Sequence, residues 1–371
     1  MNRVRVALRS PLFGTVLCAV LLVLAISVWL LTDGKTSRSD ALRTGGLAGG
    51  AIVALYALWL NDRRRRVEEA RQDIERRRHE LESRRISDER FARAIELLGD
   101  EADQVRVGAL HVLAGLAKSR PGYTQTVLDV VCAYLRRPYS HPRLTGGKGA
   151  PAPATSLDGV DPRETAEREL QVRLTAQRIL LDLLPEAGQP EAPSYDLDLT
   201  GATLEYLDCS GRKLGTVLMR YAKLHSSINF SDCDFGGPVW FTAASTNEGR
   251  LTGRFRCTNS TFRERAWFSG TEFGELADFT GTTFIGQASF KDATFNGDAL
   301  FGTTSFHSGL DLRRARFASR LDLRWKREPE TISLYNTVIE PEVETDLPEN
   351  WATTKLPDGQ TKLTAPPAQP S

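Results

Sequence analysis

The sequence is poor in the residue types that build metal centres and reactive sites. Five cysteines and five histidines are scattered over 371 residues, and no C-x-x-C pair or zinc-type Cys/His spacing occurs. The spacing excludes a zinc-ribbon module and gives no sign of a disulfide framework. We expect the thiols to be buried and reduced, and we expect neither a metal nor a cofactor.

Catalytic motifs are absent as well. The sequence contains no G-x-S-x-G, H-E-x-x-H or kinase-type set. The run GGKG at 146–149 lacks the rest of a phosphate-binding loop, and no predicted strand leads into it. We therefore predict that the protein is not an enzyme.

An excess of charge of one sign is also missing. The chain has 48 basic and 47 acidic residues, which gives a formal net charge of +1. Proteins that bind nucleic acid over a large surface carry a strongly basic balance or patch. No nucleic-acid partner is expected.

Phenylalanine, by contrast, recurs at a regular and unusual interval in FTGTTFIGQASFKDATFNGDALFGTTSF, residues 279–306. The gaps between successive rings alternate between five and six residues. A helix would scatter such rings around its axis, and a flat strand would place them on alternate faces. A chain that turns a corner about every five residues buries every ring, and four such sides close one coil of a solenoid. A β-sandwich has no reason to keep this interval over the eleven large residues from 268 to 323.

The interval extends in both directions from this stretch, and each large residue is usually preceded, two positions earlier, by a small or apolar one such as Ala266 or Ala277. The small residue is expected to point inward beside the large one. The predicted core anchors are Leu199, Leu204, Leu214, Leu224, Phe230, Phe235, Phe262, Phe268, Phe273, Phe279, Phe284, Phe290, Phe295, Phe301, Phe306, Leu312, Phe317 and Leu323.

The segments ATLEY, AKLHS, ASFKD and ATFNG resemble the pentapeptide-repeat motif A-(D/N)-(L/F)-x-x, and the resemblance covers residues 195–323. The resemblance, to a membrane-anchored bacterial type, implies a right-handed quadrilateral β-helix. The extra residue in alternate repeats departs from the motif and predicts coils of about 22 residues with one pair of looser corners. The pattern is blurred at 242–256, which could be a bulge or a loop.

Two apolar runs near the N-terminus, 11–31 and 42–60, predict a pair of transmembrane helices in a hairpin that anchors residues 1–61. A cleaved signal peptide fits less well, because the first run is too long and a second run follows. Arginines flank both outer ends of the hairpin. The positive-inside rule then places both termini and the soluble part in the cytoplasm of a multi-pass plasma-membrane protein.

Small and basic residues beside these runs suggest further contacts. Gly45, Gly46, Gly49 and Gly50 form two G-x-x-x-G pairs that are predicted to pack membrane helices, within one hairpin or in a homodimer. Arg63, Arg64, Arg65 and Arg66 are predicted to contact anionic lipid headgroups.

The remaining segments are predicted to be mostly helical. A charged stalk at 62–98, with a partial heptad pattern, precedes a small HEAT-like helical module at 87–137 that Ser87 and Asp88 would cap. A Gly/Pro/Ala-rich linker follows at 138–162, and a helix at 163–184 is expected to cap the solenoid. Residues 324–371 are assigned to a C-terminal cap, with a disordered tail after 351.

The predicted function is that of a membrane-anchored cytosolic scaffold whose solenoid faces bind an unknown protein. One alternative is a DNA mimic that regulates gyrase or topoisomerase, and another is a membrane-linked signalling component. Residues 195–323 contain 15 acidic and 14 basic residues. This balance disfavours the acidic surface that a DNA mimic requires.

Overall fold

The structure is a computed structural model that describes residues 20–26, 28–29, 32, 38–141, 144, 162–244, 253–349, 351–357 and 361–364. The chain divides into two compact units, residues 1–87 and residues 88–371. We describe each unit by itself, starting with the second.

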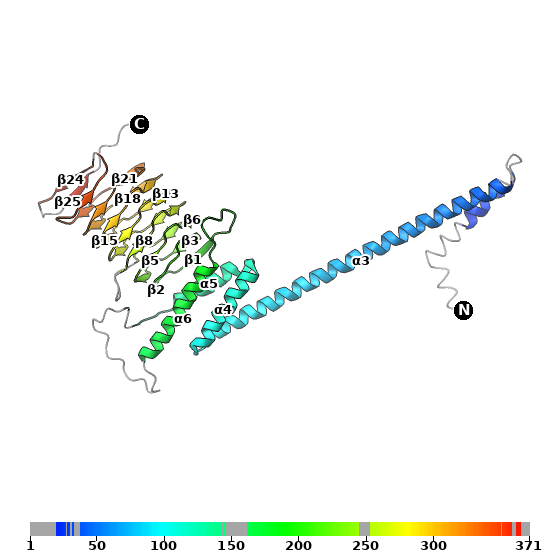
Figure 1. The fold of residues 1–371 in the computed structure, drawn as a ribbon, viewed down its shortest axis with the longest axis horizontal. Helices are drawn as coiled ribbons and strands as arrows, with labels where there is room; N and C mark the ends of the chain where they lie inside the picture. Colours follow the sequence, from blue (N-terminus) through cyan, green and yellow to red (C-terminus); the bar gives the residue numbers. More distant parts are fainter. Residues whose placement is uncertain are drawn as a thin grey trace. The chain divides into compact units, whose positions relative to one another are not determined.

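Short parallel strands build most of the second unit into a right-handed β-solenoid of about seven turns (Figure 1). The strands form four walls, numbered in the order in which the chain meets them. Wall 1 contains β1 (Tyr195–Asp198), β3 (Lys213–Leu218), β7 (Val239–Trp240), β10 (Ala266–Trp267), β14 (Ala288–Ser289), β18 (Gly309–Asp311) and β21 (Thr331–Ser333). Wall 2 contains β2 (Thr203–Glu205), β4 (Lys223–His225), β11 (Glu272–Phe273), β15 (Thr294–Phe295), β19 (Arg316–Phe317) and β22 (Val338–Ile339). Wall 3 contains β5 (Ile228–Asn229), β8 (Phe255–Arg256), β12 (Ala277–Asp278), β16 (Ala299–Leu300), β20 (Leu321–Asp322) and β23 (Thr345–Asp346). Wall 4 contains β6 (Asp234–Phe235), β9 (Thr261–Phe262), β13 (Thr283–Phe284) and β17 (Ser305–Phe306).

Strand pairing fixes the length of each coil. In the first coils Leu204 pairs with Leu224, twenty residues later. In the regular part Ala266 pairs with Ala288, twenty-two residues later, which confirms the coil length predicted from the alternating gaps. Between β7 and β10 the step is twenty-seven residues, because Val239 pairs with Ala266. The five extra residues of this coil therefore lie between wall 2 and β8, within the segment 242–256 where the repeat pattern is irregular. Residues 245–252 of this segment lie outside the described residues.

The corners explain the alternation of five and six. Each five-residue gap closes a tight turn in which one residue has positive φ, and these residues recur every eleven positions. They include Gly281 (φ 72°), Asp292 (φ 59°) and Thr303 (φ 56°). A backbone hydrogen bond closes such a turn, as from the Thr282 N–H to the Phe279 carbonyl oxygen at 3.0 Å. The six-residue gaps are bends, so the extra residue relaxes every second corner, as the sequence predicted.

The core of the solenoid is a set of aromatic columns. All eighteen predicted anchors lie in the interior with 0 or 1% exposure. Rings from successive coils stack almost parallel, as for Phe235 on Phe262 (centroids 4.5 Å apart) and Phe284 on Phe306 (5.2 Å). Rings from opposite walls meet edge to face, as Phe279 of wall 3 meets Phe290 of wall 1 at 5.2 Å. Both are the favourable aromatic geometries.

The small inward position is not always apolar. Ser260, Thr271, Thr282, Thr304 and Thr337 occupy it with 0 or 1% exposure. Each hydroxyl donates a hydrogen bond to a backbone carbonyl of the preceding coil; Thr304 Oγ1, for example, lies 2.9 Å from the Phe279 oxygen. A buried hydroxyl is tolerated here because its partner is built into the turn below it.

Helices close the N-terminal end of the solenoid. The helices are α4 (Asp103–Ser119), the short 3-10 helix η1 (Pro121–Tyr123), α5 (Thr124–Leu135) and α6 (Pro162–Leu183). An open solenoid end exposes unpaired strand groups, and side chains from these helices bind them. Gln125 bonds the Asp196 backbone through both its amide atoms at 2.9 Å, and Gln177 donates to the Glu205 carbonyl at 3.3 Å.

Arg173 of α6 is the central residue of this cap and is only 2% exposed. Its Nη2 donates to the Leu135 carbonyl at the end of α5 and to the Thr203 carbonyl of β2, the latter at 3.2 Å. Its guanidinium lies 4.8 Å from the centre of the Tyr139 ring. Burial lowers the pKa of Arg173, and the nearby Glu169 carboxylate opposes that shift. One side chain thus connects two helices and the first coil.

A β-hairpin covers the other end. β24 (Ala352–Lys355) and β25 (Thr361–Thr364) pair antiparallel, and β25 adds to β22 in antiparallel register. The sequence predicted disorder after residue 351, and this is wrong for the hairpin. The threonines of β24 and β25 have high β-propensity, and β25 satisfies the edge of the last coil by pairing with β22. The predicted linker, 138–162, lies mostly outside the described residues.

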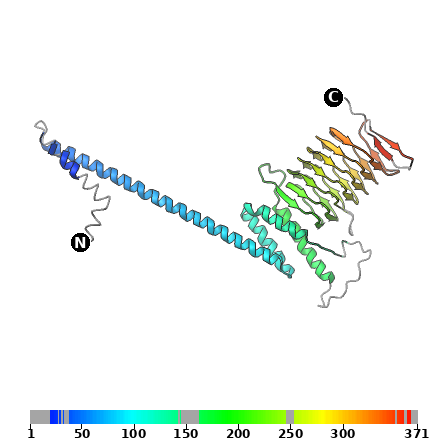
Figure 2. The same cartoon turned by 180° about the vertical axis from the view of Figure 1, so that it is seen from behind.

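The described part of the first unit is dominated by α3 (Arg38–Leu98), a single helix of 61 residues that continues into the second unit. Figure 2 shows it without a break. The sequence predicted a helix start at Ser87, but Ser87 lies inside α3 and donates back to the Ser83 carbonyl at 2.9 Å. Helix-favouring Arg and Glu on both sides of Ser87 carry the helix through the expected cap.

The predicted transmembrane hairpin is wrong. Within the described ranges no helix is long and apolar enough to cross a membrane. The uncharged core of the second run, 45–60, would cover only about 24 Å at 1.5 Å per residue, less than the about 30 Å hydrocarbon core. It continues directly into the charged part of α3. The first run, 11–31, lies largely outside the described residues, and the multi-pass plasma-membrane location with cytoplasmic termini falls with the hairpin.

The aromatic columns predict a large penalty for truncating a central ring. Phe290→Ala removes a fully buried ring that stacks on Phe268 at 4.8 Å. We expect the free energy of unfolding to fall by about 3–5 kcal/mol. Urea unfolding followed by circular dichroism measures it. Ile285→Ala, a truncation at a 42% exposed position on the outer surface, is the control and should cost less than about 1 kcal/mol. Equal losses for the two variants would contradict the stacked core.

The cap predicts a second stability effect. Arg173→Met keeps the length of the side chain but leaves buried carbonyl groups without donors, so we expect a loss of about 1–3 kcal/mol. Arg173→Lys should recover only part of it, because lysine lacks the planar fork. The matched control is Arg168→Met, since Arg168 is 56% exposed and pairs with Glu164 one turn away in the same helix. Similar unfolding midpoints for the Arg173 and Arg168 variants would argue against the cap.

Candidate interaction surface

The outward positions of wall 1 carry a row of apolar and aromatic side chains. Strand register places Leu218 beside Trp240, and Trp240 beside Trp267, in three successive coils. Arg220, Tyr221 and Arg265 flank the row. We call these six residues the tryptophan platform.

The two indoles lie flat against each other. Their ring centroids are 4.8 Å apart and their planes differ by 10°. This spacing equals the distance between neighbouring strands, so identical residues in successive coils stack without leaving their register. Both tryptophans are half-buried. Each therefore presents part of an aromatic side chain to solvent from a backbone that is paired with the neighbouring strands of wall 1.

Two arginines lie against the tryptophan rings of the platform. The Arg220 guanidinium carbon lies 5.2 Å from the Trp240 ring centroid, and that of Arg265 lies 5.9 Å from Trp267. Both separations are within the range of cation–π attraction. Both arginines are exposed. Trp, Tyr and Arg are the residues enriched at the energetic centres of protein interfaces.

Tyr221 occupies an unfavourable backbone conformation. Its φ is 56°, and its side chain is 66% exposed. Glycine takes the same corner in other coils, at Gly201 and Gly270. Non-glycine residues take the same conformation at other tight corners, as at Tyr206 and Thr303, so the positive φ belongs to the repeat. Tyr221 contributes to the platform through its exposed aromatic ring.

Elsewhere on the solenoid, many exposed charges pair with one another. Arg263 bonds Asp234 of the preceding coil at 2.7 and 3.0 Å, and Arg320 bonds Asp346 at 2.8 Å. The hydrogen bond from Arg314 lowers the pKa of Asp292. These pairs tie successive coils together on the outside. Their charges are already satisfied within the fold.

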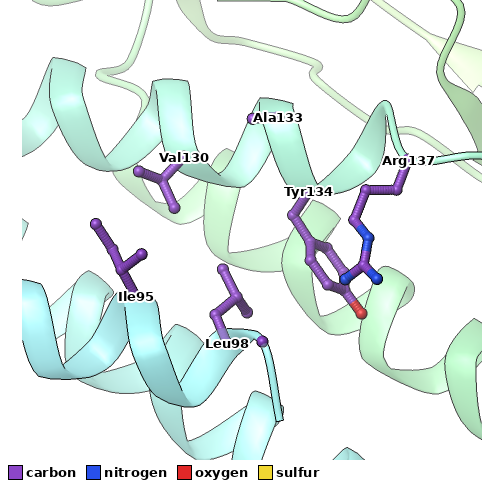
Figure 3. A pocket seen from close by; sticks show the side chains of 7 residues that line it. Ile95, Leu98, Val130, Ala133, Tyr134 and Arg137 are labelled. Carbon is purple, nitrogen blue, oxygen red and sulfur yellow. The ribbon is translucent and has the colours of Figure 1, made fainter. Parts of the chain in front are cut away.

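A shallow apolar depression of about 250 Å³ lies in the helical part of the second unit, lined by Ile95, Leu98, Gly99, Val130, Ala133, Tyr134 and Arg137. In Figure 3, Ile95 and Leu98 of α3 face Val130 and Tyr134 of α5 across it. The lining offers few polar groups, so it provides no arrangement for acid–base or nucleophilic chemistry.

The polar network next to this depression is structural. Arg106 of α4 binds the Glu169 carboxylate of α6, and the Tyr134 hydroxyl donates to Glu169 at 3.0 Å. Burial and the adjacent Glu169 charge raise the pKa of Tyr134 to about 12. Burial likewise raises the pKa of Cys132 to about 12. Neither group is ionised near neutral pH, and the network joins three helices.

The glycines and arginines that were predicted to contact the membrane belong to α3 and are not part of the tryptophan platform. A Cβ added at Gly49 would collide with Val23, so the two apolar runs approach closely there. Around Gly46 and Gly50 there is open space, and Gly45 is not described at the side-chain level. Arg63, Arg64, Arg65 and Arg66 are exposed, and Arg65 and Arg66 pair with Glu69 and Asp62. Their contact with lipid stays a prediction.

The sequence did not predict the platform, because the repeat pattern identifies only the inward residues. A signal was present, because each tryptophan directly precedes a core anchor, Phe241 or Phe268. Only the strand register across the irregular segment 242–256 shows that the two tryptophans lie side by side. In the described part of the chain, no cluster of three or more His, Cys, Asp or Glu residues could hold a metal ion.

Comparison with known proteins agrees with the geometry. A family model for pentapeptide repeats, nine copies, matches residues 258–305 and 279–324. No curated protein and no solved structure matches the chain. Both matched ranges lie in the regular 22-residue coils, and strand pairing continues the same architecture back to β1. The repeat motif, the family match and the four-walled solenoid together identify the chain as a pentapeptide-repeat protein.

Proposed function

We propose that the protein is a non-catalytic scaffold that binds another protein through the tryptophan platform. The observation that carries the proposal is the stacked pair Trp240 and Trp267, partly exposed on the outer face of wall 1. A pentapeptide-repeat solenoid suggests a protein-interaction or scaffold module in general. The platform names the part of the surface that would do the binding.

The chemistry of the platform also limits the partner. Two exposed arginines beside aromatic faces favour acidic and aromatic side chains in the partner. The same arginines disfavour the DNA-mimic alternative, since imitation of a nucleic acid requires a negative surface. A rigid platform loses little conformational entropy on binding, so modest area can suffice for a specific contact.

Substitution of both tryptophans tests this proposal. Full-length protein and the variant Trp240→Ala/Trp267→Ala are used as bait in cell extract, and retained proteins are quantified by mass spectrometry. We expect one or more proteins to be retained by the wild type and lost from the double variant. For the purified partner we expect affinity to fall about 30-fold or more, as for interface residues worth about 2 kcal/mol or more.

The control is Ile285→Ala, which removes an exposed apolar side chain from wall 4. It should retain the same proteins as the wild type. An unchanged set of proteins on the double variant, with circular dichroism showing intact fold, would disprove binding through the platform.

A further inference from the structure

The middle of α3 presents apolar side chains that nothing in the described chain covers. Every residue from 61 to 86 is exposed. Val67, Ile74 and Leu81 recur at intervals of seven and are 49%, 66% and 65% exposed. A long helix with no packed face gains its stability only from local interactions. A seven-residue apolar period marks the seam of a coiled coil.

The charges beside the seam follow the same period. With Val67, Ile74 and Leu81 at position a of the heptad, Arg71, Arg78 and Arg85 fall at position e. Asp73 and Glu80 fall at position g. One edge of the seam is thus basic along its length. The other edge begins with Arg66, which pairs with Asp62 of its own helix, and carries acids in the next two heptads, so the Arg66–Arg71 contact of a parallel pair is the one that joins like charges.

This arrangement distinguishes the two possible directions of a partner helix. In a parallel pair, position g of one helix faces position e of the next heptad on the other. Asp73 would then face Arg78 of the second copy, and Glu80 would face its Arg85. In an antiparallel pair, e faces e and g faces g, so arginine would oppose arginine and acid would oppose acid.

We propose that residues 66–85 of α3, the heptad segment, form a parallel, in-register, two-stranded coiled coil with a second copy of this chain. Val67 and Ile74 are the β-branched residues that two-stranded coiled coils favour at position a, although position d holds Ala70, Arg77 and Arg84 where those coiled coils carry leucine. The proposal concerns α3 alone and does not depend on the tryptophan platform.

Arginine at two core positions of the seam requires an explanation. Arg77 and Arg84 occupy position d, where leucine is usual. Each lies four residues after an acid of position g, Asp73 or Glu80, which is the favourable order for an ion pair along a helix. Their stems can cover the seam while their charges reach its edge. Arginine at two core positions lowers the stability of the coiled coil. The ion pairs between positions g and e are therefore needed to hold the two helices together, and they fix the register.

Single cysteines test direction and register. Val67→Cys and Leu81→Cys, each alone in a Cys18→Ser background, lie about 21 Å apart along the helix. The cysteines at 132, 209, 233 and 257 are buried and do not interfere. Under mild oxidation we expect both single variants to form disulfide-linked dimers, because only a parallel, in-register pair brings each residue to its own copy.

His79→Cys is the matched control, because position f faces away from the seam. It should stay monomeric on a non-reducing gel. Efficient cross-linking of the His79 variant, or none of the Val67 and Leu81 variants, would overturn the proposal. Cross-linking of Val67→Cys with Leu81→Cys only when the two are mixed would show an antiparallel pair and would overturn it too.

Charge reversal gives an independent measurement. Asp73→Arg/Glu80→Arg makes both edges basic, and Arg78→Glu/Arg85→Glu makes both edges mainly acidic. By light scattering we expect each variant alone to dimerise at least about 10-fold more weakly than the wild type, and an equimolar mixture to recover the dimer. A wild type that is monomeric at high concentration, or reversed variants that dimerise as well as the wild type, would disprove the pairing.

Discussion

The parallel register between successive coils is the constraint on which the solenoid depends. Because each strand pairs with its equivalent one coil later, equivalent side chains are held at the strand spacing and must stack on one another. Inside, this aligns phenylalanines into columns. Outside, it aligns Trp240 with Trp267, and it pairs Asp234 with Thr261 so that Arg263, two residues further on, can reach the Asp234 carboxylate. Core packing, surface ion pairs and the candidate binding surface thus have one origin.

The ends of the solenoid are completed by side chains and a strand pair that do not follow the repeat. Arg173, Gln125 and Gln177 bind backbone groups of the first coil, and β25 pairs with the last wall 2 strand. Repeats can only satisfy their neighbours, so terminal coils require unlike partners. The helical cap also fixes where wall 1 begins, which places the tryptophans three and four coils from the N-terminal end.

The repeat itself could be derived from the sequence, since the interval of phenylalanines leaves few backbones that bury them all. The coil length and the looser corners followed from the same interval. The sequence did not predict the features that depend on contacts between residues far apart in the chain. Neither Arg173, a charged residue in a helix that looked amphipathic, nor Phe255, which fills a small-residue position beside Cys257, was recognised as core. The prediction of a membrane hairpin was wrong. It rested on the hydropathy of 42–60 alone, whereas this run is part of one long helix whose remainder is charged.

The coil between β7 and β10 holds five more residues than its neighbours, yet the strands on either side keep their pairing and their stacked rings. The number of residues between wall 2 and wall 3 can therefore change without a change in strand pairing or in the stacking of the inner rings. A pentapeptide-repeat chain can therefore differ in length, and so in specificity, between wall 2 and wall 3 of one coil while the described strands keep their pairing.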